Sequence, residues 1–249
     1  MWDKERWESR WRVGIMNLIG WSLAALFPIL FPLIKRIPAS QVSHTLALLR
    51  HYPNFAYTWF GEDLPELLLL YVVILAVATI TREWQSGTIE FLAQMPMKPA
   101  QIVLQKGLWA SIEVIIAAVS SSAVLWMASA VSGHHLPWQP YVLSILLMTA
   151  GFIGIWWLVS ALAWALHSTM AVIIVGVVIF AESLVTASIP VLAPYSILIY
   201  ISNTSPRPSM ARLWAHVGIL AGIAVILGWI ALQVAKRQEW IPNHGRDQM

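Results

Sequence analysis

The sequence has no cysteine among its 249 residues, and only 11% of them are charged. The missing thiols exclude disulfides and thiolate chemistry. A soluble domain carries about a quarter charged residues, so the low charge excludes that class. The net charge of +3 is too small for a basic nucleic-acid-binding face. What remains, 59% hydrophobic residues with 15 Trp, is typical of a polytopic membrane protein, whose aromatic rings collect at the lipid–water interfaces.

Sequence motifs of catalysis are absent as well. There is no G-x-x-x-x-G-K-[ST] loop for ATP phosphates, no H-E-x-x-H and no G-x-S-x-G. We therefore expect no enzyme activity and no cofactor on this chain. His134 and His135 are adjacent in a loop that could reach a metal, but they have no acidic or cysteine partner close in sequence, so we expect no metal site.

Six apolar stretches are long enough to cross a bilayer as helices, which takes about 20 residues each. They cover residues 13–34, 64–81, 107–131, 141–166, 170–189 and 213–235. The second is short, and helical continuation at either end would supply the missing length. The sequence thus predicts an all-α integral membrane protein with one transmembrane domain over residues 1–249.

Basic residues flanking the spans predict the orientation, because Lys and Arg concentrate in cytoplasmic segments. With both termini inside, most of the 15 Lys and Arg residues fall on the cytoplasmic side. In residues 1–12, Trp alternates with Lys and Arg. This pattern predicts either a short amphipathic helix lying in the inner interface or plain aromatic anchoring.

Two carboxylates, Glu113 and Glu182, lie inside predicted spans. An ionisable group at membrane depth is costly, so each is a candidate for lining a transport pathway. The alternative for Glu113 is contact with interfacial water or with Lys106. The alternative for Glu182 is hydrogen bonding to Ser or Thr groups, with Ser183 and Thr186 close in sequence.

Residues 82–106 mix charges, glycine and proline between two apolar spans. Gly87 and its neighbours predict a helix break, and Pro96 predicts the end of a short helix between them. Pro99 is tolerated in the first turn of a further helix that would run into the third span. The short helix has an apolar ridge and a polar flank, so it fits either a groove in another protein or the lipid interface.

This segment resembles the signature of the type-2 exporter permeases, the membrane subunits of ABC-2 type transporters. The pattern is R-E-x-x-x-G-T-x-E-x-L-x-x-x-P, followed by a basic residue, here Lys98, and by a lysine that opens the third span. The matching residues are Arg82, Glu83, Gly87, Thr88, Glu90, Leu92, Pro96 and Lys106. Six spans and an apolar segment between the fifth and sixth extend the resemblance to the whole length.

The resemblance implies a mechanism and partners. Two permease subunits, identical or different, would form the pathway in a prokaryotic cytoplasmic membrane with both termini cytoplasmic. A separate ATPase subunit would bind ATP and Mg²⁺ and hold the short helix in a groove, which Ile89 and Leu92 would fill. Residues 190–206 would re-enter the membrane as an external gate.

Two other classes remain open, an integral-membrane enzyme or assembly factor and a secondary transporter. The missing catalytic motifs and the scarcity of intramembrane charge count against them. No pattern selects a cargo.

Overall fold

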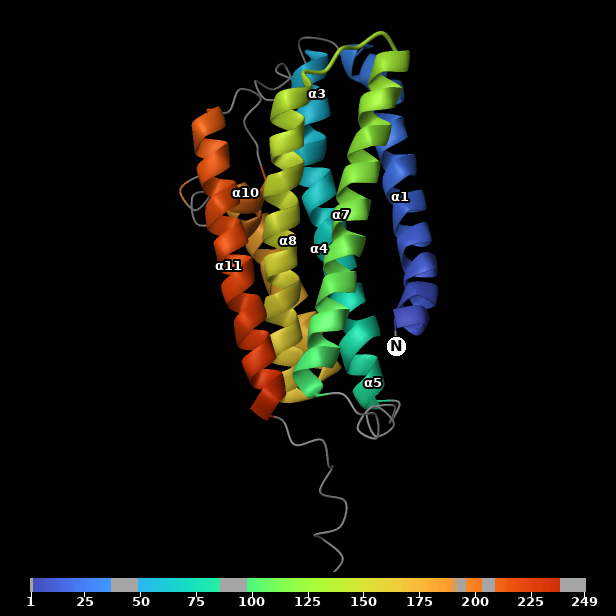
Figure 1. Cartoon of the computed structure of the whole chain (residues 1–249). Helices are drawn as coiled ribbons and strands as arrows, with labels where there is room; N and C mark the ends of the chain where they lie inside the picture. The colour runs from blue at the N-terminus through green and yellow to red at the C-terminus, as the bar shows by residue number, and fades with distance from the viewer. Residues whose placement is uncertain are drawn as a thin grey trace, which may run out of the picture.

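The computed structural model describes residues 2–36, 49–85, 98–189, 191, 196–202 and 209–237. Throughout these residues the regular structure is helical and no strand occurs. Six helices stand side by side and are long and apolar enough to cross a membrane (Figure 1). The predicted fold class, an all-α protein with six spans, is confirmed.

The first span is the single helix α1, Trp2–Arg36. Its N-terminal turns belong to the same helix as the span. Over the described residues 2–12 there is therefore no separate interfacial helix. Neither glycine nor proline interrupts residues 2–13, and Lys, Glu and Arg are good helix formers, so nothing stops the helix there. Trp7 and Trp11 are 64% and 68% exposed on this extension.

The second span is built from five short segments without a break. They are α3 (Tyr52–Thr58), the π-helical η2 (Trp59–Asp63), α4 (Leu64–Ala76), the π-helical η3 (Val77–Thr81) and α5 (Arg82–Gln85). Helix continues beyond both ends of the short apolar stretch, as its length required. In η3 the Arg82 N–H donates to the Val77 carbonyl, five residues back, which is the bond that defines a π-helix.

The remaining elements are α7 (Pro99–Val131), α8 (Trp138–Leu166), α9 (Thr169–Ser188), α10 (Ile197–Ile201) and α11 (Met210–Arg237). The helix α7 begins at Pro99 as predicted, and the Lys98 N–H donates to the Gln101 side chain at 3.0 Å. Antiparallel α8 and α9 are joined through His167, whose φ of 51° is left-handed and turns the chain.

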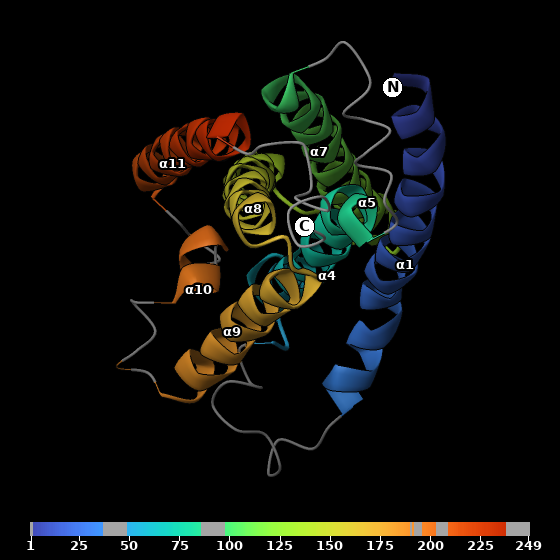
Figure 2. The same cartoon turned by 90° about the horizontal axis from the view of Figure 1, so that it is seen from below.

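The helix α8 lies at the centre, and α4, α7, α9 and α11 pack around it (Figure 2). Small residues let these backbones approach closely, which is how membrane helices associate. An added Cβ at Gly154 would lie 3.7 Å from the Ala224 Cβ on α11. The indole of Trp157 fills the space beside both Gly107 on α7 and Gly228 on α11. The Trp pair at positions 156 and 157 therefore serves packing.

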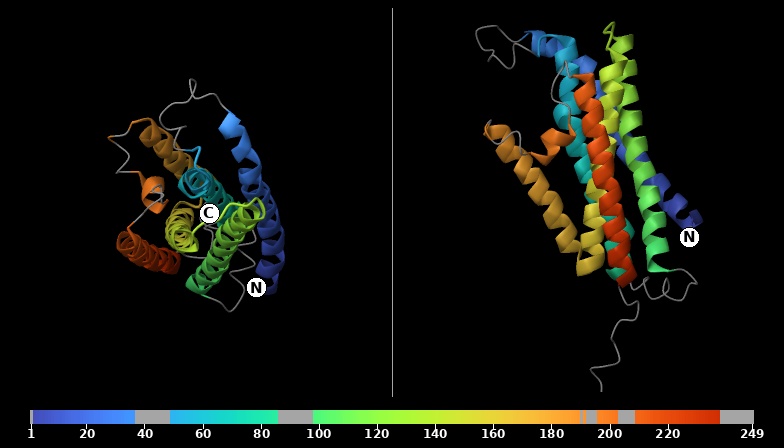
Figure 3. Two further views of the ribbon diagram at one scale, coloured as in Figure 1. Left: turned by 90° about the horizontal axis from the view of Figure 1, so that it is seen from above. Right: turned by 60° about the vertical axis from the view of Figure 1, so that its left-hand side comes forward.

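One end of the bundle, here called the base, carries the start of α1, α5, the start of α7 and the end of α11 (Figure 1). From the base, α9 leans away from the other helices toward its C-terminal end (Figure 3). The short α10 packs against α8 and α9, between α9 and α11 in the chain.

Candidate functional site

Three of the predicted coupling residues lie at the base. Arg82 and Glu83 are on α5, and Lys106 is two turns into α7. The other predicted coupling residues lie outside the described part of the chain: Gly87, Thr88, Ile89, Glu90, Leu92 and Pro96. The structure therefore describes the two arms that flank this segment, the base hairpin arms, defined here as α5 and residues 98–106.

The two arms are joined by a buried ion pair. The Lys106 Nζ lies 3.0 Å from the Glu83 Oε1, and the side chains are 1% and 10% exposed. Such a partner stabilises a buried lysine in its charged form, because an uncompensated charge away from water costs several kcal/mol. The ends of the signature, 23 positions apart in the sequence, thus neutralise each other.

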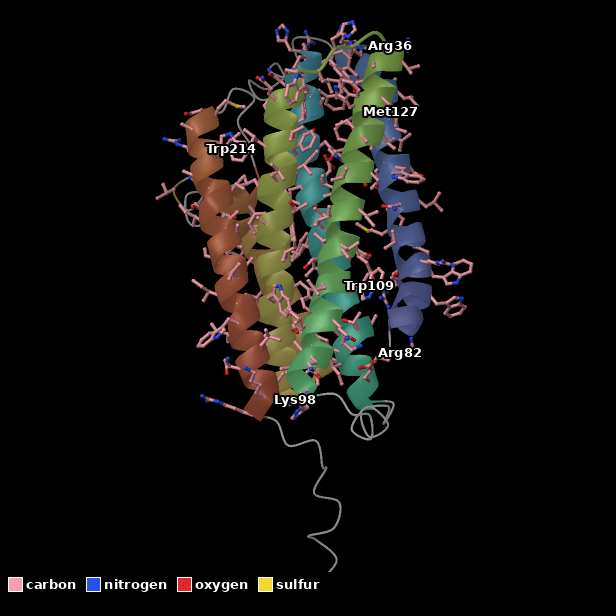
Figure 4. The ribbon with its side chains drawn as sticks, viewed as in Figure 1. Arg36, Arg82, Lys98, Trp109, Met127 and Trp214 are labelled. Atoms are coloured by element: carbon pink, nitrogen blue, oxygen red, sulfur yellow. The ribbon has the colours of Figure 1, made fainter. Side chains whose placement is uncertain are left out.

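Two cations on the arms remain at the surface. Arg82 and Lys98 are both exposed at the base, one on each side of residues 86–97 in the chain (Figure 4). Their side chains are open to the surroundings, whereas Glu83 and Lys106 pair between the arms.

Glu113 is the centre of a second polar cluster. The Arg12 Nη2 donates to the Glu113 Oε1 at 2.9 Å, and the Tyr71 hydroxyl donates to the Oε2 at 2.7 Å. These residues come from α1, α4 and α7, so one carboxylate ties three helices together. The expected neighbour Lys106 pairs with Glu83 instead. One further polar contact joins α1 and α7, from the Ser120 hydroxyl to the Asn17 Oδ1 at 2.9 Å.

Glu182 contacts the backbone of another element rather than the hydroxyls near it in sequence. Its Oε2 accepts the Ile197 N–H at 3.3 Å, at the start of α10. The Thr186 hydroxyl bonds the backbone carbonyl of Glu182, not its carboxylate. The Oε1 is buried and has no hydrogen-bond partner among the described residues. The carboxylate therefore holds α10 against α9.

The only sequence signal for these arrangements was charge at membrane depth, which identified Glu113 and Glu182. It did not identify Tyr71 or the pairing with Arg12, whose sequence separation of 101 residues leaves no local pattern. Likewise, the His134 ring stacks on Tyr52, with 4.0 Å between ring centroids, a contact that no local sequence pattern predicts.

A cavity of about 330 Å³ lies between α8, α10 and α11. Gly151 and Gly154 form part of its wall, and Ser196 and Tyr200 supply its polar groups. Among the described residues, no charged side chain lines it. In the part of the chain that the structure describes, no group of three His, Cys, Asp or Glu residues could hold a metal ion.

Comparison with protein-family models, with curated proteins and with solved structures finds no match. The interpretation of the site therefore rests on the residues and their geometry.

Proposed function

We propose that this chain is the membrane-spanning permease subunit of an ATP-driven exporter. The observation that carries the proposal is the Glu83–Lys106 pair, which joins the two ends of the signature at the base of a six-span bundle. A segment of 12 residues, 86–97, follows α5 and precedes α7, so it is anchored at both ends to braced helices. Such an anchored segment can transmit a force from a partner protein into the spans.

In this function the chain supplies the pathway and the mechanical connection, and a partner ATPase supplies ATP binding with Mg²⁺. Ile89 and Leu92 occupy the ATPase groove. Gly87 allows the chain to turn before them, and Glu90 makes a polar contact with the ATPase. A second permease copy or a related subunit completes the pathway. The glycine, prolines and charges of residues 82–106 are then explained together, as a binding site for the ATPase subunit.

The base is the cytoplasmic end in this proposal. Exposed cations lie on the elements of this end: Arg10 on α1, Arg82 on α5, Lys98 before α7, and Lys236 and Arg237 at the end of α11. Basic residues favour the cytoplasmic side, and even numbers of spans return the chain to the side where it began. The membrane is the cytoplasmic membrane of a prokaryote.

The segment between the fifth and sixth spans is the external gate in this proposal. Its described part, α10, is fixed by contacts from three helices. Ile201 packs against Gly151 on α8, Glu182 on α9 holds its first turn, and Tyr200 stacks on His216 of α11 with 4.7 Å between centroids. Opening would require these contacts to separate.

The proposal is tested with the chain and its partner ATPase reconstituted in lipid. Gly87→Val and Glu90→Arg should insert normally but abolish the effect of the permease on ATP hydrolysis, because the segment no longer fits the groove. Matched controls are Gly218→Val, at an exposed glycine with open space around it, and Glu62→Arg, at an exposed carboxylate outside the base. Wild-type hydrolysis by both test variants would refute the coupling assignment.

A further inference from the structure

We infer that the base hairpin arms move together with α7 as one body, and that η3 is the joint that releases this body from α4. The mechanical part of this inference concerns the chain alone. Its role in transport rests on the proposed function.

The ion pair between Glu83 and Lys106, here called the brace, joins the two arms. Glu83 is on α5, directly after η3, and Lys106 is on α7. Their ion pair is almost fully buried, so separating the arms would break a contact between opposite charges away from water, which is costly. A force applied to the segment between the arms therefore moves α5 and the start of α7 together.

The joint is η3, which lies in the chain immediately before α5 and its residue Glu83. In η3 the i→i+5 pattern replaces α-helical bonding, and π segments are sites where helices bend. Two hydroxyls bond the backbone there, from Thr79 to the Leu75 carbonyl at 2.7 Å and from Thr81 to the Val77 carbonyl at 3.0 Å. Hydroxyls that bond carbonyls one turn back let a buried helix bend while those carbonyls stay satisfied.

Above the joint, α4 is anchored to another helix. An added Cβ at Gly176 on α9 would lie 3.5 Å from the Val73 Cβ, so these backbones are in close contact. Tyr71, six residues before η3, also gives α4 a hydrogen bond to Glu113 on α7. Thus α4 is packed tightly with α9, while α5 is tied to α7.

Beyond the brace, α7 is continuous through Val131 and contacts several neighbouring helices along its length. Glu113 and Ser120 connect it to α1, and Gly107 receives the Trp157 ring of α8. We therefore assign α7 as the lever that carries a displacement of the base into α1 and α8.

The experiment uses nitroxide spin labels, which attach only to introduced cysteines because the native chain has none. Three label pairs sit at exposed positions: Arg82–Lys98 across the brace, Arg82–Leu70 across η3, and Leu70–Leu184 across the α4–α9 contact. Distances are measured in lipid nanodiscs, first with the chain alone and then with the ATPase in its nucleotide-free and ATP-bound states.

With the chain alone, we expect a broader distance distribution for Arg82–Leu70 than for the other two pairs. ATP binding should shift Arg82–Leu70 by on the order of 2 Å or more, as packed helices do in switching transitions, and leave the other two unchanged. Lys106→Gln should broaden Arg82–Lys98, and the exchange Glu83→Lys with Lys106→Glu should narrow it again.

Equal widths for all three pairs in the chain alone would overturn the joint. A nucleotide-dependent change in Arg82–Lys98 in the wild type would overturn the brace. Failure of any ATPase to bind the unlabelled wild-type chain would instead refute the proposed function, and the measurements on the chain alone would still decide the mechanical inference.

Discussion

The guanidinium of Arg12 lies 2.9 Å from the carboxylate of Glu113, and this pair, buried on the Glu113 side, joins α1 to α7 at the level where Tyr71 of α4 also reaches the same carboxylate. Both carboxylate oxygens of Glu113 therefore accept a hydrogen bond. A carboxylate in this state holds helices together, and its position along a transport pathway stays a prediction.

Removing one member of the pair should cost more than removing both. Glu113→Leu removes the carboxylate that both Arg12 and Tyr71 bond, and breaking a buried pair in this way lowers the free energy of unfolding by about 3–5 kcal/mol. The double variant Arg12→Leu/Glu113→Leu should lose clearly less, because apolar groups replace both charges. Thermal unfolding in detergent measures the difference. Equal losses for the single and double variants would show that the pair does not form.

The six spans follow from apolar length alone, because lipid leaves few alternatives to a helix. The start of α7 at Pro99 was equally predictable, since proline is favoured at that position and Lys98 before it is extended. The cluster around Glu113 was not, because its members come from three helices and no local pattern records the pairing. The π segments were not predicted either, since β-branched and aromatic residues such as Thr79 and Trp59 fit an α-helix as well.

Gly107 should be among the glycines least tolerant of substitution. A Cβ there would overlap the Trp157 ring, so Gly107→Ala should lower the free energy of unfolding by roughly 1–3 kcal/mol through overpacking. Gly14→Ala and Gly218→Ala have open space around them and should stabilise slightly, since alanine is the better helix former. Chemical or thermal unfolding of the three variants compares them, and a neutral Gly107→Ala would contradict the packing of α7 on α8.

Cysteines at Gly154 and Ala224 should form a disulfide between α8 and α11. The Cβ separation of 3.7 Å falls within the range that disulfides require. The change Gly154→Cys with Gly218→Cys is the matched control, because Gly218 has no neighbour within 4 Å. Oxidation in membranes followed by a gel-mobility or mass measurement detects the bond. Equal bonding in both pairs would argue against the α8–α11 register.

The contact between Glu182 and α10 predicts how far two substitutions of Glu182 will each reduce a second cross-link, between α8 and α10. Cysteines at Gly151 and Ile201 report whether α10 is docked, because a Cβ at Gly151 would lie 2.6 Å from an Ile201 side-chain carbon. Glu182→Leu should reduce the cross-linked fraction, since it removes the acceptor for the Ile197 N–H. Glu182→Gln keeps an oxygen acceptor and should reduce it less. If Glu182→Leu cross-links as fully as the parent, Glu182 does not hold α10.

The central claim is that this chain works with a separate ATPase subunit. It is tested most directly by purifying the chain from native membranes in a mild detergent. The account predicts a stoichiometric ATP-hydrolysing subunit with a Walker-A loop, lost in Ile89→Asp/Leu92→Asp and retained in Arg36→Glu at the opposite end. Purification without an ATPase, or with one that both variants retain equally, would contradict it.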